Sequence, residues 1–132
     1  MVKEKIAIDT NVVIAILNGR QSTIDLLNDY QAVYLPVIVC GELLFGAKNS
    51  ARSDENEQKC LAFINECRLL NIHELIAQEY AATRKKLKSK GKPIPENDIW
   101  IASTCIVNNL PLASYDADFK WIDELVLIDL KP

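Results

Sequence analysis

The sequence predicts an α/β protein with a central, mostly parallel sheet of about five strands and helices on both faces. Short apolar segments of strand length alternate with helical segments along the whole chain. The chain has 132 residues, of which 49 % are hydrophobic, which is enough to bury one core. No repeat or linker interrupts the pattern, so we expect residues 1–132 to form a single domain.

The first predicted strand and two helices lie within the first 30 residues. Residues 5–8, Lys-Ile-Ala-Ile, are mostly apolar and are expected to form a strand, and a helix is expected over 12–17, ended by an Asn-Gly pair. A second helix is expected to run from Ser22 to about residue 30. Ser22 would cap it, because Asp25 three residues later gives a capping-box pattern.

The next segment contains a second strand and two helices. Residues 32–35 are the strand, and Pro36 is expected at the first position of the helix that follows it. That helix, which reaches Lys48, is apolar almost all round and should be buried. A polar break precedes a further helix over 53–66.

The remaining elements continue the alternation of strands and helices. A long amphipathic helix is expected to end at Gly91, before a connector that contains two prolines. The expected elements are strands at 68–72, 112–115 and 126–130, helices at 74–90 and from 96 or 97 to 109, and one helical turn at 119–122.

Composition excludes several classes of protein. The net charge of −3 gives no general attraction to nucleic acid, and no apolar run reaches the roughly 18 residues of a membrane span. The N-terminus leads directly into a strand without a signal peptide, so we expect a cytoplasmic protein without membrane contact. The four cysteines form no CxxC pair, which disfavours zinc and indicates reduced thiols in apolar helical surroundings; they are Cys40, Cys60, Cys67 and Cys105.

Four acidic residues occupy positions that should be buried. Asp9 and Asp116 directly follow apolar strands, Glu42 lies in the middle of an apolar helix, and Asp98 crowns the apolar stripe of another. No lysine or arginine occurs in residues 6–19, 32–47 or 93–119. Buried carboxylates without nearby bases are the composition of a site for a hard divalent metal, Mg²⁺ or Mn²⁺.

Structural explanations compete with a metal site. Asp9, Asp98 and Asp118 are each at a position where a helix N-cap is common. Glu42 is mid-helix and has no capping role, although it would be satisfied by a distant arginine. A non-catalytic binding module with buried acids is therefore one alternative. An aspartyl-phosphate phosphatase is disfavoured, because the DTNVV segment lacks the second aspartate two residues after Asp9.

Four segments together resemble the PIN domain, and within it the VapC toxins of toxin–antitoxin pairs. They are DTN at 9–11, CGELLFGA at 40–47, NDIWIA at 97–102 and LASYDADF at 112–119. The resemblance covers essentially the whole chain. It implies a three-layer fold with a central parallel sheet and a magnesium-dependent ribonuclease whose acids cluster at the carboxyl edge of the sheet. A housekeeping PIN nuclease is the alternative within this family.

Residue roles follow from the resemblance by position. Asp9, Glu42, Asp98 and Asp116 match the acidic quartet, with Asp9 and Asp98 as our choice of direct metal ligands and Glu42 and Asp116 as further metal contacts. The polar residues Thr10, Asn11 and Ser114 would orient ligands or waters. Asp118 matches a less regular acidic position. The products should carry a 5′-phosphate and a 3′-hydroxyl.

The expected partners are RNA, with tRNA as one candidate, a VapB-type antitoxin that blocks the acidic groove, and a second copy of the chain.

The single histidine, His73, lies far from the acids in sequence and is expected to be structural. A basic cluster near the end of the long helix either binds RNA phosphates or complements the helix dipole and solvates its surface. Its members are Arg84, Lys85, Lys86, Lys88, Lys90 and Lys92. Trp100, Phe119 and Trp121 are expected in the core or in a dimer interface.

Overall fold

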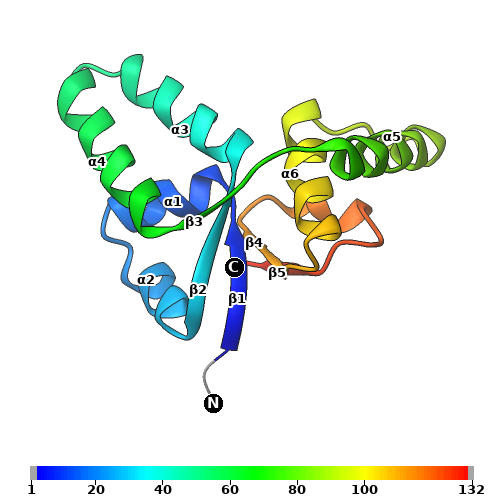
Figure 1. Ribbon diagram of the computed structural model, residues 1–132, viewed down its shortest axis with the longest axis horizontal. Coiled ribbons are helices and arrows are strands. Elements are labelled where there is room, and N and C mark those ends of the chain that lie inside the picture. The colour runs from blue at the N-terminus through cyan, green and yellow to red at the C-terminus, as the bar shows by residue number, and fades with distance from the viewer. Residues whose placement is uncertain (1–2, 131–132) are drawn as a thin grey trace.

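The computed structural model describes residues 3–130 and contains a five-stranded sheet in which every pair of neighbouring strands is parallel (Figure 1). The strands are β1 (Lys3–Ile8), β2 (Tyr30–Pro36), β3 (Arg68–Leu70), β4 (Leu112–Ser114) and β5 (Leu127–Asp129). The helices are α1 (Thr10–Leu17), α2 (Gln21–Asn28), α3 (Val37–Lys48), α4 (Ser53–Glu66), α5 (Glu74–Ser89), α6 (Glu96–Val107) and the 3₁₀ helix η1 (Ala117–Trp121). The α/β class predicted from the sequence is confirmed.

The order of the strands explains why the helices cover both faces. The order is β3-β2-β1-β4-β5, so the chain moves outward from β1 to β3 and then returns past β1 to β4. Crossovers between parallel strands are right-handed, so reversing direction along the sheet moves the connecting helices to the other face. Accordingly, α1 to α4 lie on one side of the strands and α5 and α6 on the other (Figure 1).

The centre of the core is the carboxyl half of β1. Ile6, Ala7 and Ile8 have no exposed surface, whereas the lysines at the start of the strand are exposed. β1 pairs with β2 on one side and with β4 on the other, through Ala7 opposite Leu112 and Ile8 opposite Ala113. A strand buried on both faces reads as a continuous apolar run, which is why the segment before Asp9 predicts its place so clearly.

Two predicted helix starts were wrong by one residue. α2 begins at Gln21 rather than at a Ser22 cap, and the Gln21 side chain donates a 2.7 Å hydrogen bond to Asp25. Pro36 is the last residue of β2, where it pairs with Leu70, and it precedes the first residue of α3. An extended Pro36 suits both roles, because its missing N–H is needed neither at the end of the strand nor by the helix.

The cysteines differ in burial and in local structure. Cys40, Cys60 and Cys105 are buried, but Cys67 is half-buried and extended, because it ends α4 and leads into β3. The expectation of a helical setting for Cys67 was therefore wrong. Within residues 3–130, no helix combines the length and the apolar character needed to cross a bilayer.

Candidate active site at the carboxyl edge of the sheet

The acidic residues meet where the sheet changes direction. β1 and β4 are neighbours in space, but the helices that follow β1 and those that precede β4 lie on opposite faces. Such a switch point leaves a crevice outside the carboxyl ends of the strands, where open α/β sheets bind their ligands. Asp9 immediately follows β1, and Ser114 and Asp116 lie at and just beyond the end of β4.

Asp9 is both a helix cap and a member of this site. Its Oδ1 accepts a hydrogen bond from the backbone N–H of Val12 (3.3 Å), and its Oδ2 accepts one from the Ser114 hydroxyl (2.5 Å). Burial, with smaller contributions from the charges of Asp116 and Glu42, raises the pKa of Asp9 to about 6 despite these two bonds. The capping explanation is therefore correct for Asp9 but incomplete.

A hydrogen bond between Thr10 and Glu42 links the helix that follows β1 to the helix that follows β2. Glu42 is half-buried in the middle of α3, and its Oε1 accepts a 2.7 Å hydrogen bond from the Thr10 hydroxyl at the start of α1. No arginine or lysine of the described chain pairs with Glu42. The alternative of a distant arginine partner is thus not the arrangement in this structure.

Asp98 lies in the first turn of α6 and is half-buried. It does not cap the helix, because Pro95 occupies the N-cap position. Burial raises the pKa of Asp98 to about 6, and the negative charges of Asp116, Glu42 and Asp9 contribute in that order. Repulsion from these other acids shows that four segments distant in sequence bring their charges together.

Asp116 and Asp118 occupy different positions after β4. Asp116 caps η1, since its Oδ1 accepts the N–H of Asp118, and its own N–H donates a 2.9 Å hydrogen bond to the Ser114 hydroxyl. Asp118 is exposed within η1, so the predicted capping role belongs to Asp116 instead. Asp118 still adds to the negative charge felt by Asp98.

These side chains surround a pocket of about 150 Å³. Its lining contains oxygen ligands and no basic residue; the lining residues are Asp9, Thr10, Asn11, Glu42, Asp98, Ile101 and Asp116. Asn11 is exposed at the pocket, and Ile101, an apolar wall of it, carries no signal that sequence reasoning recognised. The structure thus brings the predicted quartet together with Thr10 and Asn11, and leaves Asp118 outside the lining.

A family model described as PIN domain matches residues 6–125. This chain belongs to the PIN domain family. The match contains every acid of the pocket, from Asp9 at its start to Asp116 near its end.

Relatives of this PIN domain extend over nearly the whole chain. Ribonuclease VapC of Rickettsia bellii is 33 % identical over 129 residues, covering 92 % of this chain and 92 % of its own length. Ribonuclease VapC2 of Rickettsia felis is 27 % identical over 125 residues, covering 91 % and 93 %. Among solved structures, VapBC2 from Rickettsia felis bound to a promoter DNA fragment matches with a TM-score of 0.87 and 26 % identity, covering 96 % of this chain and 99 % of that one.

The donor set of this PIN domain fits a hydrated divalent cation. All polar lining atoms are oxygens or an amide, and burial disfavours the ionised forms of Asp9 and Asp98 when no cation accompanies them. Within residues 3–130, no three acid, histidine or cysteine side chains are close enough to enclose one ion by themselves. A divalent cation that keeps several of its waters fits this spacing, because one or two carboxylates are enough to hold such an ion.

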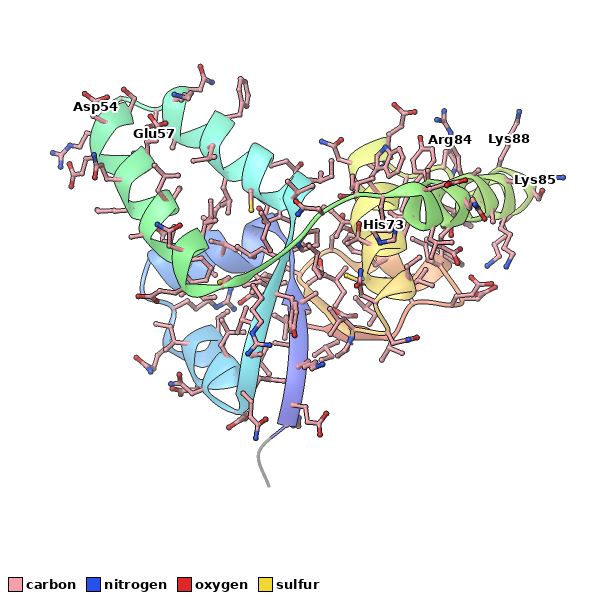
Figure 2. All side chains as sticks on the ribbon, viewed as in Figure 1. Asp54, Glu57, His73, Arg84, Lys85 and Lys88 are labelled. Carbon is pink, nitrogen blue, oxygen red and sulfur yellow. The ribbon has the colours of Figure 1, made fainter. Side chains whose placement is uncertain are left out.

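The basic cluster does not line the pocket of the PIN domain. Arg84, Lys86 and Lys90 form ion pairs with Glu96, Glu124 and Asp123. Lys85 and Lys88 are exposed and point outward along α5 (Figure 2). His73 precedes the first residue of α5, is exposed, and is not among the pocket residues.

Phe119, Trp100 and Trp121 of the PIN domain pack against other side chains rather than forming an exposed stacking platform. Phe119 is 1 % exposed. Trp100 is half-buried and stacks on Tyr80, with ring centroids 4.0 Å apart. The Trp121 ring is half-buried and has Lys92 and Lys120 over it. Phe119 is thus a core residue as expected, whereas a core or dimer-interface role for the half-buried Trp100 and Trp121 stays a prediction.

Proposed function

We propose that this chain is a magnesium-dependent endoribonuclease of the VapC type, which hydrolyses RNA phosphodiester bonds at the acidic pocket. The observation that carries the proposal is the convergence of Asp9, Glu42, Asp98 and Asp116 on one pocket without a basic residue. Its membership of the PIN domain family and its similarity to proteins named ribonuclease VapC support the same reaction.

Asp9 and Asp98 are the direct metal ligands in this proposal. Their raised pKa values indicate that the fold holds both carboxylates ready for a cation that the protein itself does not provide. Glu42 and Asp116 would contact the ion through water, since the acids are too far apart to enclose it together. A bound Mg²⁺ supplies charge neutralisation at the scissile phosphate and activation of the attacking water, and Mn²⁺ would serve the same purpose.

The surrounding polar residues orient the acids. Thr10 fixes the Glu42 carboxylate, and Ser114 fixes that of Asp9 while accepting the N–H of Asp116. Hydrogen bonds of this kind set the direction and basicity of metal-binding carboxylates. Asn11, exposed at the pocket, would donate its amide to the RNA backbone or to an ordered water.

A VapB-type antitoxin is the proposed protein partner. A groove of about 320 Å³ between α1, α3 and α4 has apolar walls, including Ile14 and Leu17, and reaches Glu42 at one end. A peptide with apolar side chains and one cation would fill the groove and neutralise the acids. The complex of VapB and VapC proteins seen for the Rickettsia felis relative supports this class of partner.

A homodimer through α3 is also proposed. Phe45 is 70 % exposed, and with Val37, Ile38 and Gly41 it lines an apolar depression that borders Thr10 and Glu42. An exposed apolar surface of this kind typically marks an interface.

A cytoplasmic location suits an RNA substrate and the buried, reduced thiols of Cys40 and Cys105.

The test is cleavage of RNA by the purified chain, free of antitoxin. We expect cleavage with Mg²⁺ and none with EDTA, and products with a 5′-phosphate, detected with a 5′-phosphate-dependent exonuclease. Asp9→Asn and Asp98→Asn should each reduce the rate by more than about 100-fold, because a lost ligand should exceed the effect of a lost outer contact. Asp54→Asn, at the exposed start of α4 (Figure 2), is the matched control. Wild-type rates in both site variants would refute the proposal.

A further inference from the structure

Tyr115 stands between two residues of the acidic site, Ser114 and Asp116, but its own side chain does not line the pocket. Instead, its hydroxyl shares a hydrogen bond with the Thr23 hydroxyl of α2, 92 residues away in sequence. The guanidinium of Arg20, which precedes the first residue of α2, lies over the Tyr115 ring at 4.8 Å from the centroid. Two residues at the start of α2 therefore hold the Tyr115 ring in place.

The segment that follows Ser114 needs an anchor of this kind. Strand pairing ends at Ser114, whose carbonyl accepts the N–H of Leu130 at 2.8 Å. The N–H groups of Asp116 and Asp118 bond locally, the first to the Ser114 hydroxyl and the second to the Asp116 carboxylate. Ser114 is fixed by β4 and by its hydrogen bond to Asp9, but these local bonds do not fix the direction of the segment that follows it.

The chain bends at Tyr115, so this residue is able to set that direction. Ser114 before it is the last residue of β4, and Asp116 after it has φ −88° and ψ 109°. Asp116 lines the acidic pocket, whereas the Tyr115 hydroxyl contacts Thr23 of α2. Anchoring Tyr115 to α2 therefore fixes the bend and, with it, the position of Asp116.

We propose that Tyr115, through Thr23 and Arg20, is a positioning residue that keeps the Asp116 carboxylate at the acidic pocket. The inference concerns the site of the proposed function and rests on it for its consequence, metal binding. The positioning itself is a property of the protein without metal. Tyr115 is not a catalytic residue, because it touches none of the reacting groups.

The Tyr115–Thr23 contact is also tightly specified. Thr23 is 2 % exposed, and every buried side-chain oxygen and nitrogen within residues 3–130 has a hydrogen-bond partner. Tyr115→Phe would leave the Thr23 hydroxyl without one, which destabilises the fold as well as releasing the segment. The double variant Tyr115→Phe/Thr23→Val removes both hydroxyls. It should therefore recover stability without restoring the anchoring of residue 115 to α2.

The molecule provides a matched control in Tyr34. Its hydroxyl accepts a 3.3 Å hydrogen bond from Arg68, whose guanidinium lies 5.8 Å from the ring centroid. Tyr34→Phe thus makes the same chemical change under an arginine, between β2 and β3, at a residue that does not line the acidic pocket.

The experiment measures amide hydrogen exchange at Asp116 and Asp118 by NMR in metal-free protein, and Mn²⁺ affinity by calorimetry. In Tyr115→Phe we expect exchange at both amides to rise about 5-fold and the affinity to fall about 5-fold, within the range of couplings between contacting residues. The double variant should match these two values while its urea midpoint returns toward that of the wild type. Tyr34→Phe should change neither exchange nor affinity by more than about 2-fold.

The possible results separate the two proposals. Equal effects of Tyr115→Phe and Tyr34→Phe, or recovery of exchange and affinity in the double variant, would overturn the positioning role. A wild-type protein that binds no Mn²⁺ would refute the proposed function. In that case exchange at Asp116 and Asp118 would still decide whether Tyr115 holds the segment.

Discussion

The Ser114 hydroxyl donates a 2.5 Å hydrogen bond to Oδ2 of Asp9 and so joins the ends of two neighbouring parallel strands. The same hydroxyl accepts the N–H of Asp116. One buried oxygen thus links two acids of the proposed metal site. Ser114 has no exposed surface, so water does not compete for these bonds.

Removal of this hydroxyl should weaken metal binding. Ser114→Ala frees one oxygen of Asp9 and leaves the Asp116 N–H without its acceptor. We expect Mn²⁺ affinity, measured by calorimetry, to fall by about 10-fold to 100-fold, the usual effect of losing an outer-shell partner. Ser114→Thr, which keeps a hydroxyl, should retain most of the affinity.

Ser103→Ala is the control for this change. Ser103 is equally buried, but its hydroxyl donates to the Ile99 carbonyl within α6 and contacts no acid. Its affinity for Mn²⁺ should equal that of the wild type. Equal affinities in the Ser114 and Ser103 alanine variants would show that the Ser114 bond does not support the site.

The pKa of Asp9 predicts a pH dependence of stability in metal-free protein. Burial raises this pKa from 3.8 to about 6, so folding favours the protonated carboxyl. The contribution of Asp9 to stability is complete below about pH 4 and is lost as the pH rises through 6. The unfolding free energy of Asp9→Asn relative to wild type should therefore increase between pH 4 and 7, by up to about 3 kcal/mol.

Urea denaturation with EDTA at several pH values measures this difference. Asp54→Asn, on the exposed first turn of α4, should show no such increase. Addition of Mg²⁺ should stabilise the wild type at pH 7 but not Asp9→Asn, because binding to the folded state alone raises stability. A difference that is flat across pH would contradict the assigned pKa.

The Thr10 hydroxyl should matter for activity through Glu42. Thr10→Val removes the 2.7 Å hydrogen bond that orients the Glu42 carboxylate and leaves the shape of the side chain nearly unchanged. We expect RNA cleavage to slow by about 10-fold or more. Thr83→Val is the control, since Thr83 is buried and donates to Glu79 within α5, outside the pocket. Equal rates in the two variants would exclude an orienting role for Thr10.

The outer end of α5 tests whether the basic cluster binds RNA. Lys85 and Lys88 are exposed, whereas three of their neighbours form ion pairs. If both bind phosphates of single-stranded RNA, Lys85→Ala/Lys88→Ala should reduce the slope of log affinity against log salt by about 1.4, since each contact adds about 0.7. Lys3→Ala/Lys5→Ala, at the opposite end of β1 from Asp9, is the charge-matched control. An unchanged slope would mean that the cluster only solvates the helix.

The exposed face of α3 should control the oligomeric state. Phe45→Glu places a charge where the proposed dimer would bury an apolar ring, so we expect a monomer by sedimentation at concentrations where the wild type is a dimer. Val126→Glu, at a 66 % exposed position just before β5, should leave the dimer intact. A dimer that survives in Phe45→Glu would remove α3 from the interface.

Local sequence was sufficient for the strands and helices of the core. The apolar run before Asp9 and the Gly91 stop depend on burial or backbone geometry that neighbouring residues specify. The expectation that the apolar helix α3 is buried was wrong for one face, where Phe45 is 70 % exposed. The helix starts at Gln21 and after Pro36 were less predictable. Arg20 and Pro36 precede the first residues of these helices without any side-chain capping bond, so the pattern of capping residues carries no signal there.

The sequence by itself determined the α/β class and the four acids in apolar settings, because the period of apolar residues and the absence of nearby bases are local properties. Only the tertiary structure decided that Asp9 is both cap and pocket residue, that Asp98 is no cap, and that Asp118 stays outside. It also paired Thr10 with Glu42 and Tyr115 with Thr23. These relationships join residues 32 and 92 positions apart, and they depend on strand order and on which face each crossover covers, which short-range patterns do not encode.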